Sequence, residues 1–457
     1  MTQCRLIKTV SVTMGGQRIR RLVPVIVLGC VLIGLTGCIF QEVKEQQQKI
    51  SALCTVEGKV RTDKSDNYPL VVLLLRRPDG ISDIKVKWQL ADHYVLEGPG
   101  RWFFRASPGN YALVAFEDRN ANLIYEPDEP ALDTLPNQLI ACGAGMRIEN
   151  PELVIPVTGR VAVDGPVDIA GLQVRTIQQQ LDISLGAVTA VGEVTTLDDP
   201  RFSEEHASQG LWHPFDFLFE ARPGIYFLEP YNKKKTPVLF VHGIGGTPIN
   251  FRYLIEHLDR ERFQPWVYYY PSGAHLNGVA DHLDQTVKRL QLMHGFKRLL
   301  LVAHSMGGLV SRGFLLRNQT ETQRADIPLF VSISTPWGGV PFAATGVKHA
   351  PTVVWVWYDM APRSAYLRQL FYRDPDRITE HRSLPPETTH HLLFGFQRDS
   401  LSLGESDDQV VSVASQLYPG AQQDAVRLYG FDATHEGILE KDVVSRLLNQ
   451  LLVEAIR

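Results

Sequence analysis

The second half of the chain alternates short apolar runs with longer amphipathic ones. The short runs are continuous enough for buried strands, and the longer ones repeat apolar residues at helical spacing. From about residue 223 the two kinds follow one another in turn, which predicts a doubly wound, mostly parallel sheet. The predicted strands are 237–242, 264–270, 298–304, 327–334, 390–396 and 425–429, and the predicted helices are 249–258, 279–293, 306–316 and 438–455. A long excursion at about 336–388 interrupts this 223–457 unit and predicts a cap.

Residues 51–157 follow a different pattern, in which short strand-like runs are separated by Gly, Pro, Asn and Asp. This predicts a small antiparallel β-sandwich. Its expected strands are 55–61, 70–76, 102–106, 111–117 and 146–157. The run 109–116, followed by an Asp/Asn-rich turn, resembles the prealbumin-like modules of secreted bacterial proteins. Residues 158–222 then predict a β-rich connector that packs on the next domain.

The first forty residues have the features of a targeting segment. Arg18, Arg20 and Arg21 precede an apolar run at 22–35, which ends in Leu35-Thr36-Gly37-Cys38. The last four residues resemble the lipobox of bacterial lipoproteins. This resemblance implies a signal peptide at 1–37, a lipidated Cys38 and a tether at 38–50. Because Ile39 stands where an inner-membrane retention signal has Asp, it also implies the outer membrane of a Gram-negative cell. The alternative is an uncleaved transmembrane helix near 22–40, which four small or polar residues weaken.

Composition limits the remaining functions. The apolar content of 44% predicts a packed interior. The net charge is −4, and the first forty residues contain basic but no acidic side chains, so the rest of the chain is more acidic still. Such a body is a poor phosphate-backbone binder, and we expect no nucleic-acid partner.

Two further groups of residues suggest a disulfide and a calcium site, and each has a simpler alternative interpretation. Cys54 and Cys142 bracket the predicted sandwich and suggest a disulfide, since export permits one, or else two buried thiols. Asp118, Asn120 and Asn122 have the alternate spacing of a calcium loop. Because Leu123 stands where such a loop needs glycine, an Asx-rich turn is favoured. The sequence predicts no cofactor.

The residues with the clearest chemistry are Ala303-His304-Ser305-Met306-Gly307, between a predicted strand and a predicted helix. Small residues two before and two after a serine allow the strained turn that lifts a nucleophilic hydroxyl above a sheet edge. Ala303 replaces the more usual glycine, which a methyl group allows. Alone, such a match is weak, but the strand before it and the helix after it strengthen the prediction that Ser305 is a nucleophile.

A second glycine-rich bend, His242-Gly243-Ile244-Gly245-Gly246, follows the first strand. Such a bend can aim backbone N–H groups at a developing oxyanion. We therefore predict an oxyanion hole made by the N–H groups of Ile244 and Met306. An ordinary strand-to-helix turn is the alternative. The ring of His242 is expected to support the turn rather than to transfer protons.

The acid and the base are predicted from positions after the excursion. Asp408-Gln409-Val410-Val411 is similar to the Asp-Gly-x-Val of many lipases, with Gln409 in place of glycine, so Asp408 is the predicted acid and Asp407 the alternative. His435 lies between the last predicted strand and the last helix and is the predicted base. A serine hydroxyl becomes nucleophilic when a base takes its proton, and a carboxylate holds that imidazole in the right tautomer.

The order Ser305, Asp408, His435 is that of the α/β-hydrolase superfamily. Residues 224–457 therefore resemble its lipases and esterases, most of all bacterial triacylglycerol lipases and membrane-bound deacylases of lipid anchors. The resemblance implies hydrolysis of acyl esters through a covalent acyl-enzyme. The turn Thr335-Pro336-Trp337-Gly338-Gly339 is also similar to one in lipases, and the aromatic excursion after it fits either a lid over an acyl chain or a packing cap.

Three functions are thus compatible with the sequence. The first is a membrane-anchored serine hydrolase of lipid or other acyl esters. The second is an acyltransferase or amidase with the same triad. The third is a non-catalytic interaction lipoprotein, which a complete triad makes less favourable.

Overall fold

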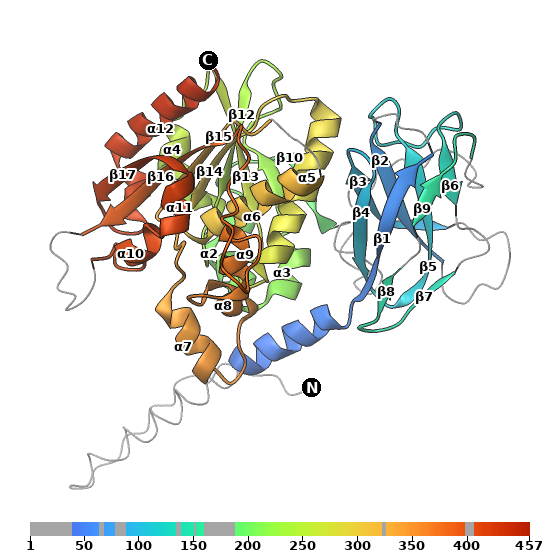
Figure 1. Cartoon of the computed structure of the whole chain (residues 1–457), viewed down its shortest axis with the longest axis horizontal. Helices are drawn as coiled ribbons and strands as arrows, with labels where there is room; N and C mark the ends of the chain where they lie inside the picture. Colours follow the sequence, from blue (N-terminus) through green and yellow to red (C-terminus); the bar gives the residue numbers. More distant parts are fainter. Residues whose placement is uncertain are drawn as a thin grey trace, which may run out of the picture.

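The computed structural model of the 457-residue chain describes residues 39–63, 68–77, 88–133, 139–149, 152–159, 188–321, 326–397 and 406–457. The predicted signal peptide (1–37), the predicted lipidation residue Cys38 and residues 160–187 of the predicted connector lie outside the described residues. Figure 1 shows an all-β part beside a larger part in which a sheet is covered by helices.

The all-β part consists of two packed sheets. In the first, β1 (Cys54–Thr62) pairs antiparallel with β4 (Gly100–Ala106) and parallel with β8 (Arg147–Glu149) and β9 (Leu153–Ile155). The second has the order β3-β2-β5-β6, with β7 on β5, and its bounds are β2 (Leu70–Arg76), β3 (Gln89–Leu96), β5 (Gly109–Glu117), β6 (Ala131–Asp133) and β7 (Ile140–Cys142). The predicted strand 146–157 is in fact two, β8 and β9.

Strand β2 is apolar from Leu70 to Leu75 because both of its faces are covered. Val72 packs between the sheets with Trp102 and Phe104. Leu73 points to the opposite face and packs with Phe116. A disulfide joins Cys54 at the start of β1 to Cys142 at the end of β7, with the two Cα atoms 5.8 Å apart. It connects the entry of the chain into this part with its second sheet.

The larger part is built on an eight-stranded sheet in the order β10-β11-β13-β12-β14-β15-β16-β17. The pair β11–β13 is antiparallel, and the other described pairs are parallel. The bounds are β10 (Ala190–Val194), β11 (Gly224–Phe227), β12 (Thr236–Val241), β13 (Phe263–Tyr269), β14 (Leu300–His304), β15 (Leu329–Ile333), β16 (Thr389–Phe396) and β17 (Ala425–Asp432). The predicted strands coincide with β12 to β17 within three residues at each end.

Helices cover both faces of this sheet. Val241 of β12 packs on the side of α5 (Leu276–His294) and α6 (Met306–Glu321), whereas its neighbour Phe240 packs on the side of α4 (Arg252–Glu256) and α12 (Asp442–Ala455). The short 3-10 helices η4 (Pro248–Phe251) and η5 (Gly437–Glu440) begin two of the predicted helices. This arrangement is an α/β-hydrolase fold preceded by a small all-β sandwich. The excursion between β15 and β16 forms the cap helices α7 (Pro341–His349), α8 (Trp355–Met360) and α9 (Ala365–Phe371).

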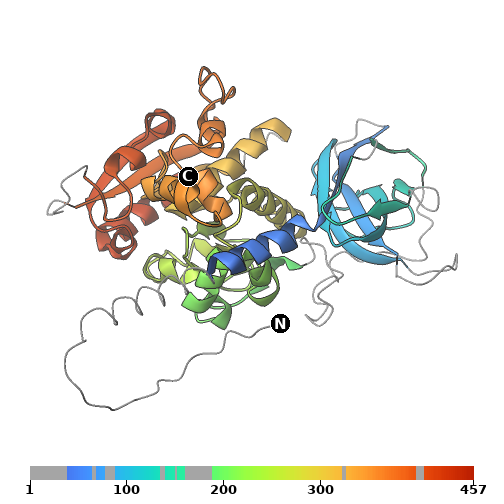
Figure 2. The same cartoon turned by 90° about the horizontal axis from the view of Figure 1, so that it is seen from below.

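Two segments differ from the sequence-based expectation. The predicted tether is a helix at residues 39–51, because one side of it is covered: Val43 and Gln46 are 2% and 4% exposed. Within the predicted connector, residues 190–220 supply the edge strand β10, the 3-10 helix η3 (Pro200–Phe202) and helices α2 (Glu204–Trp212) and α3 (Pro214–Glu220). The hydrolase part therefore begins earlier than residue 223. Seen from below, helix 39–51 lies across the hydrolase part (Figure 2).

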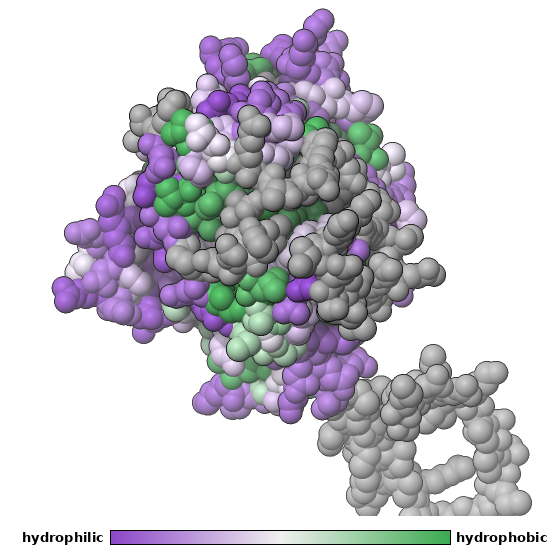
Figure 3. Space-filling view, turned by 90° about the vertical axis from the view of Figure 1, so that its right-hand side faces the viewer, coloured by the Kyte–Doolittle hydropathy of each residue, from purple (hydrophilic) through white to green (hydrophobic). Residues whose placement is uncertain are grey.

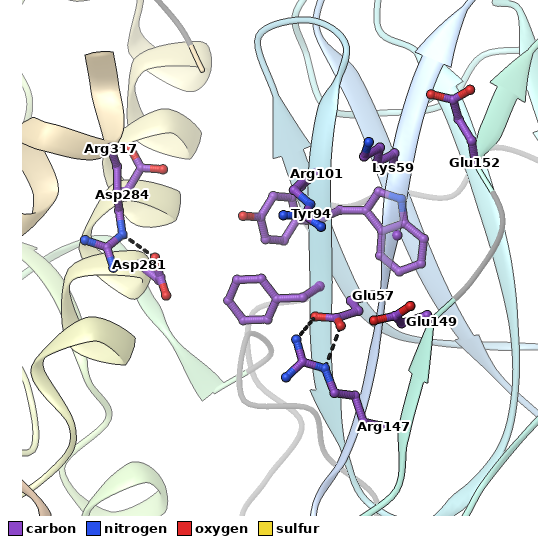
Figure 4. Close-up of a pocket in the computed structure, with 13 residues that line it drawn as sticks. Glu57, Lys59, Tyr94, Arg101, Arg147, Glu149, Glu152, Asp281, Asp284 and Arg317 are labelled. Carbon is purple, nitrogen blue, oxygen red and sulfur yellow. Dashed lines mark hydrogen bonds and ion pairs between the residues drawn. The ribbon is translucent and has the colours of Figure 1, made fainter. Parts of the chain in front are cut away.

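The two parts meet where β3 packs against α5. Strand β3 was missed from the sequence because it contains Asp92 and His93, which are polar although both are buried, and they break the apolar pattern. A pocket of about 390 Å³ lies between the parts. Its ion pairs form within each part, Arg147 with Glu57 and Arg317 with Asp281, as Figure 4 shows. The predicted catalytic residues are not among those that line it.

The surface on the β-sandwich side is mostly hydrophilic, with smaller apolar patches between polar ones (Figure 3). Across the described ranges, no helix combines the length and apolar character needed to cross a bilayer.

Candidate active site

Ser305 lies in the sharp turn between β14 and α6. Its φ is +54°, a left-handed conformation that is strained for a residue with a side chain and is typical of functional turns. The Ser305 N–H donates to the Ile333 carbonyl of β15, 2.8 Å away, which ties the turn to the neighbouring strand. Ser305 is 4% exposed. The backbone thus has the geometry of a nucleophile elbow.

Close backbone contacts explain the small residues around this turn. A Cβ on Gly307 would lie 2.2 Å from the Val241 carbonyl oxygen, so helix α6 can pack on β12 only with glycine there. A Cβ on Gly243 would lie 2.7 Å from the Cβ of Ser305. The bend after β12 is therefore in direct contact with the serine, as an oxyanion-forming bend requires.

His435 and Asp408 come together at the same edge of the sheet. His435 follows β17, Asp408 follows β16, and the imidazole Nδ1 lies 2.7 Å from Asp408 Oδ2. The His435 N–H also donates to the Asp408 carbonyl at 2.8 Å. Asp407 is only partly buried, and its carboxylate accepts from the Gln409 N–H instead. The structure thus brings Asp408, and not Asp407, to the imidazole.

Three donors besides His435 hold the Asp408 carboxylate. The N–H groups of Val410 and Val411 donate to Oδ1 at 3.1 and 2.7 Å, and Gln416 Nε2 donates to Oδ2 at 3.2 Å. Gln416 is fully buried and also binds the backbone N–H and carbonyl of Gly395 on β16. Gln416 could not be predicted from the sequence, because a single glutamine in a four-residue helix, α10 (Val413–Gln416), forms no recognisable pattern.

His304 connects the serine turn to the loop of the predicted base. Its Nε2 lies 2.8 Å from the His435 carbonyl oxygen, and the two rings are 4.7 Å apart. Burial, and next the nearby His435, lower the pKa of His304 to about 3, so this ring is neutral and donates its Nε2–H to the carbonyl. The residue before Ser305 therefore contacts His435 directly, and the two loops share one side of the sheet edge.

The predicted oxyanion donors lie on the two turns that meet at Ser305. In the bend after β12, Gly245 has φ +61°, and its N–H donates to Ser272 Oγ at 3.0 Å. Ile244 precedes it in this bend. Met306 is the first residue of α6, where an N–H has no acceptor within its own helix. Both N–H groups thus belong to turns in contact with the serine.

His242 supports the bend, as expected. Its ring stacks on Tyr270 at 4.3 Å, and its Nδ1 lies 2.8 Å from the Gly243 carbonyl oxygen. The Tyr270 hydroxyl donates to the His242 carbonyl at 2.6 Å. Burial lowers the pKa of His242 to about 4, which keeps the ring neutral.

A buried arginine on α6 attaches the cap to the helix that follows the serine. Arg312 is fully buried; its guanidinium donates to the carbonyls of Leu370 and Arg382 and pairs with Asp424 at 2.6 Å. It also lies 4.3 Å from the centre of the Phe371 ring. Burial lowers the pKa of Arg312 to about 10. Arg312 could not be recognised from the sequence, because its partners lie 58 residues or more away.

The predicted calcium residues close a turn. The Asp118 carboxylate accepts the N–H groups of Asn122 at 3.1 Å and Leu123 at 2.9 Å, which is the hydrogen bonding of an Asx-rich turn. Within the described part of the chain, no group of three or more His, Cys, Asp or Glu side chains is positioned to hold a metal ion.

One family model and several solved structures are similar to parts of this chain. The model of the lecithin:cholesterol acyltransferase family matches residues 279–349, from α5 through the serine turn to the end of α7. No curated protein matches the chain. Among solved structures, the lipase BlEst2 of Bacillus licheniformis is 15% identical, with a TM-score of 0.39 over 50% of this chain and 97% of that one. Lipase B of Aspergillus fumigatus is 16% identical, with a TM-score of 0.37 over 50% and 55% of the two chains. Phospholipase PlaB of Legionella pneumophila is 17% identical, with a TM-score of 0.32 over 40% and 45%.

Proposed function

We propose that the chain is a serine hydrolase that cleaves carboxylic esters of lipids through an acyl-enzyme. Ser305 is the nucleophile, His435 the general base and Asp408 the acid that orients it. The observation that carries the proposal is the 2.7 Å hydrogen bond between His435 and Asp408, on a loop that contacts the strained serine turn. Such a relay is what an otherwise weak serine hydroxyl needs.

The reaction follows from these positions. Ser305 Oγ attacks the ester carbonyl carbon while His435 takes the hydroxyl proton, and the carbonyl oxygen becomes an oxyanion stabilised by the N–H groups of Ile244 and Met306. The C–O bond then breaks, and His435 returns the proton to the leaving alcohol. Water attacks the acyl-serine, His435 takes a proton from it, and the acid leaves as Ser305 regains its hydrogen. Asp408 stabilises the imidazolium in both halves.

A lipid acyl group is favoured by the cap and by the family match. The cap segment contains Trp337, Val354, Val356 and Phe371, all buried within the same apolar cluster. This apolar cap, together with the likeness of residues 279–349 to a family that acts on lecithin, supports an acyl-chain substrate.

The test is hydrolysis of p-nitrophenyl esters of increasing chain length by the purified protein. Ser305→Ala is expected to abolish activity and labelling by a fluorophosphonate probe, whereas Ser311→Ala, a buried serine on the same helix, should retain both. A wild type that is neither labelled nor active would instead support the interaction lipoprotein, and activity that survives Ser305→Ala would refute the nucleophile. Faster cleavage of matched amides would favour the amidase.

The second candidate function is acyl transfer, which the acyltransferase family match favours. In that case an alcohol replaces water as the attacker of the acyl-serine. With a long-chain alcohol present, a transferase yields mainly the new ester, and a hydrolase yields mainly the free acid.

We also propose that the protein is exported and anchored in the outer membrane through a lipidated Cys38. The Cys54–Cys142 disulfide supports export, because such bonds persist in oxidising compartments. Labelled palmitate should enter the wild type and not Cys38→Ala. Equal labelling of both would remove the proposed anchor.

A further inference from the structure

Helix 39–51 is fastened to the hydrolase part by side chains along its length. Gln46 Nε2 donates to Asp216 Oδ2 at 2.7 Å, while Gln46 Oε1 accepts the N–H groups of Phe215 and Asp216 at 3.1 Å. Lys49 pairs with Asp216 at 2.9 Å, and Val43 enters the hydrolase core. Because the Gln46 side chain is buried and makes all of these hydrogen bonds, it holds the helix in one position on the hydrolase part. The chain therefore enters the folded protein at a defined place.

That place is beside the cap. Gln47 Nε2 donates to the Val353 carbonyl, just before α8, at 2.7 Å. At the first turn of the helix, Phe40 packs edge-on against Trp212, and Trp212 against Trp357 of α8. Trp357 in turn lies directly against Gly346 of α7. Figures 1 and 2 both show the start of the helix next to α7.

Helices α7 and α8 carry exposed apolar side chains. Phe342 is 47% and Tyr358 48% exposed, and Val347 and Trp355 are half-buried. Segment 341–364 has two basic residues besides His349, Lys348 and Arg363, against one acidic residue, Asp359. The Asp359 carboxylate already accepts the Leu276 N–H and contacts His275. Apolar aromatic residues with cations around them are the composition of a helix that lies in a membrane interface.

We propose that these apolar side chains of α7 and α8, the cap face, contact the phospholipid bilayer to which the chain is tethered. Consecutive Cα atoms are about 3.8 Å apart, so an anchor on Cys38 acts at the end of the helix that touches the cap. The acyl chains of the proposed lipidated Cys38 lie just before this end in the sequence, which makes lipid the occupant that the chain itself brings to the face. The proposal rests on the proposed membrane anchoring. Of the two measurements that test it, only the comparison of substrates also depends on the proposed esterase activity.

The first measurement is hydrogen exchange on the full chain, anchored in vesicles of phosphatidylethanolamine and phosphatidylglycerol, against the Cys38→Ala chain in solution. Amides of α7 and α8 are expected to exchange at least about tenfold more slowly in the vesicles. Those of α12, where Val443 is 49% exposed, should not change. The anchored Phe342→Ser/Tyr358→Ser variant should lose the protection while it stays with the vesicles.

The second measurement compares two substrates. The double variant is expected to cleave a vesicle-borne ester about tenfold more slowly and a soluble short-chain ester at the wild-type rate. A control that removes two exposed valines elsewhere, Val426→Ser/Val443→Ser, should leave both rates unchanged.

The outcomes separate this proposal from the proposed function. A wild type that hydrolyses the soluble ester but shows no protection in vesicles overturns the cap face alone. A wild type without esterase activity overturns the function, while exchange still decides the face. If the amides of α7 and α8 are protected from exchange just as strongly without vesicles, then residues 1–38 or a second copy of the chain cover the cap face. That result also overturns lipid contact.

Discussion

The hydrolase part and the β-sandwich both bury ionisable side chains, but they use them differently. In the hydrolase part the buried groups connect distant segments: Asp408 binds His435, 27 residues away, and Arg312 pairs with Asp424. In the sandwich, Asp118 and Glu129 bind backbone N–H groups within ten residues, and so close a local turn. A buried charge that joins separate loops can position chemistry, whereas one that satisfies its own turn stabilises only that turn.

The largest effect should come from the acid of the site. Asp408→Asn removes the negative charge that fixes the His435 tautomer, so kcat should fall by roughly 10⁴-fold. Asp407→Asn, the adjacent control, should change kcat by less than about threefold, because that carboxylate binds only its own turn. Steady-state hydrolysis of a soluble ester gives both numbers. Equal losses of kcat in the two variants would contradict the contrast between carboxylates that connect distant segments and carboxylates that bind only their own turn.

The fold and the centre of the site could be predicted because their signals are local. An apolar run between turns marks each central strand, and Ser305 with its small neighbours is a contiguous pattern. Gln416, Arg312 and the docking of Gln46 could not be predicted, since each depends on partners that only the folded chain brings near. Strand β3 was missed for a related reason: its polar residues Asp92 and His93 are buried only in the folded chain, which the sequence pattern does not show.

The next effect should be on stability, at the buried ion pair. Arg312→Met leaves Asp424 buried without its guanidinium partner and removes the link to the cap, so the free energy of unfolding should fall by about 4 kcal/mol. Arg446→Met breaks an exposed pair with Asp442 and should cost less than about 1 kcal/mol. Urea unfolding followed by tryptophan fluorescence measures both. If the free energy of unfolding falls by a similarly small amount in both variants, the buried Arg312–Asp424 pair contributes no more to stability than a surface pair.

A somewhat smaller effect is expected in the sandwich. Cys54→Ser/Cys142→Ser opens a covalent loop between residues 88 apart in sequence, which should destabilise this part by about 3 kcal/mol. Activity at 25 °C should remain near that of the wild type, because the bond lies outside the hydrolase part. The comparison needs thermal unfolding alongside activity. Loss of activity while the sandwich stays folded would show that the disulfide acts on the site.

The smallest effect concerns Glu129, and it tests whether a local carboxylate matters only to its own turn. Burial raises the pKa of Glu129 from 4.5 to about 7, although its oxygens accept the N–H groups of Arg119 and Glu126. The folded state then binds more protons than the unfolded state between these values. The stabilisation is therefore complete below about pH 4.5 and is lost as pH rises through about 7.

Glu129→Gln keeps a neutral side chain of the same shape, so it should flatten this decline. Asp118, whose pKa burial also raises, titrates in both proteins, so the difference between the two slopes isolates Glu129. Unfolding of the sandwich at pH 5 and pH 8 measures it, and the ratio of esterase rates at the two pH values should be the same in both proteins. A changed ratio would mean that the charge of Glu129 affects the active site. The distinction between buried charges that connect distant segments and those that act only on their own turn would then be wrong.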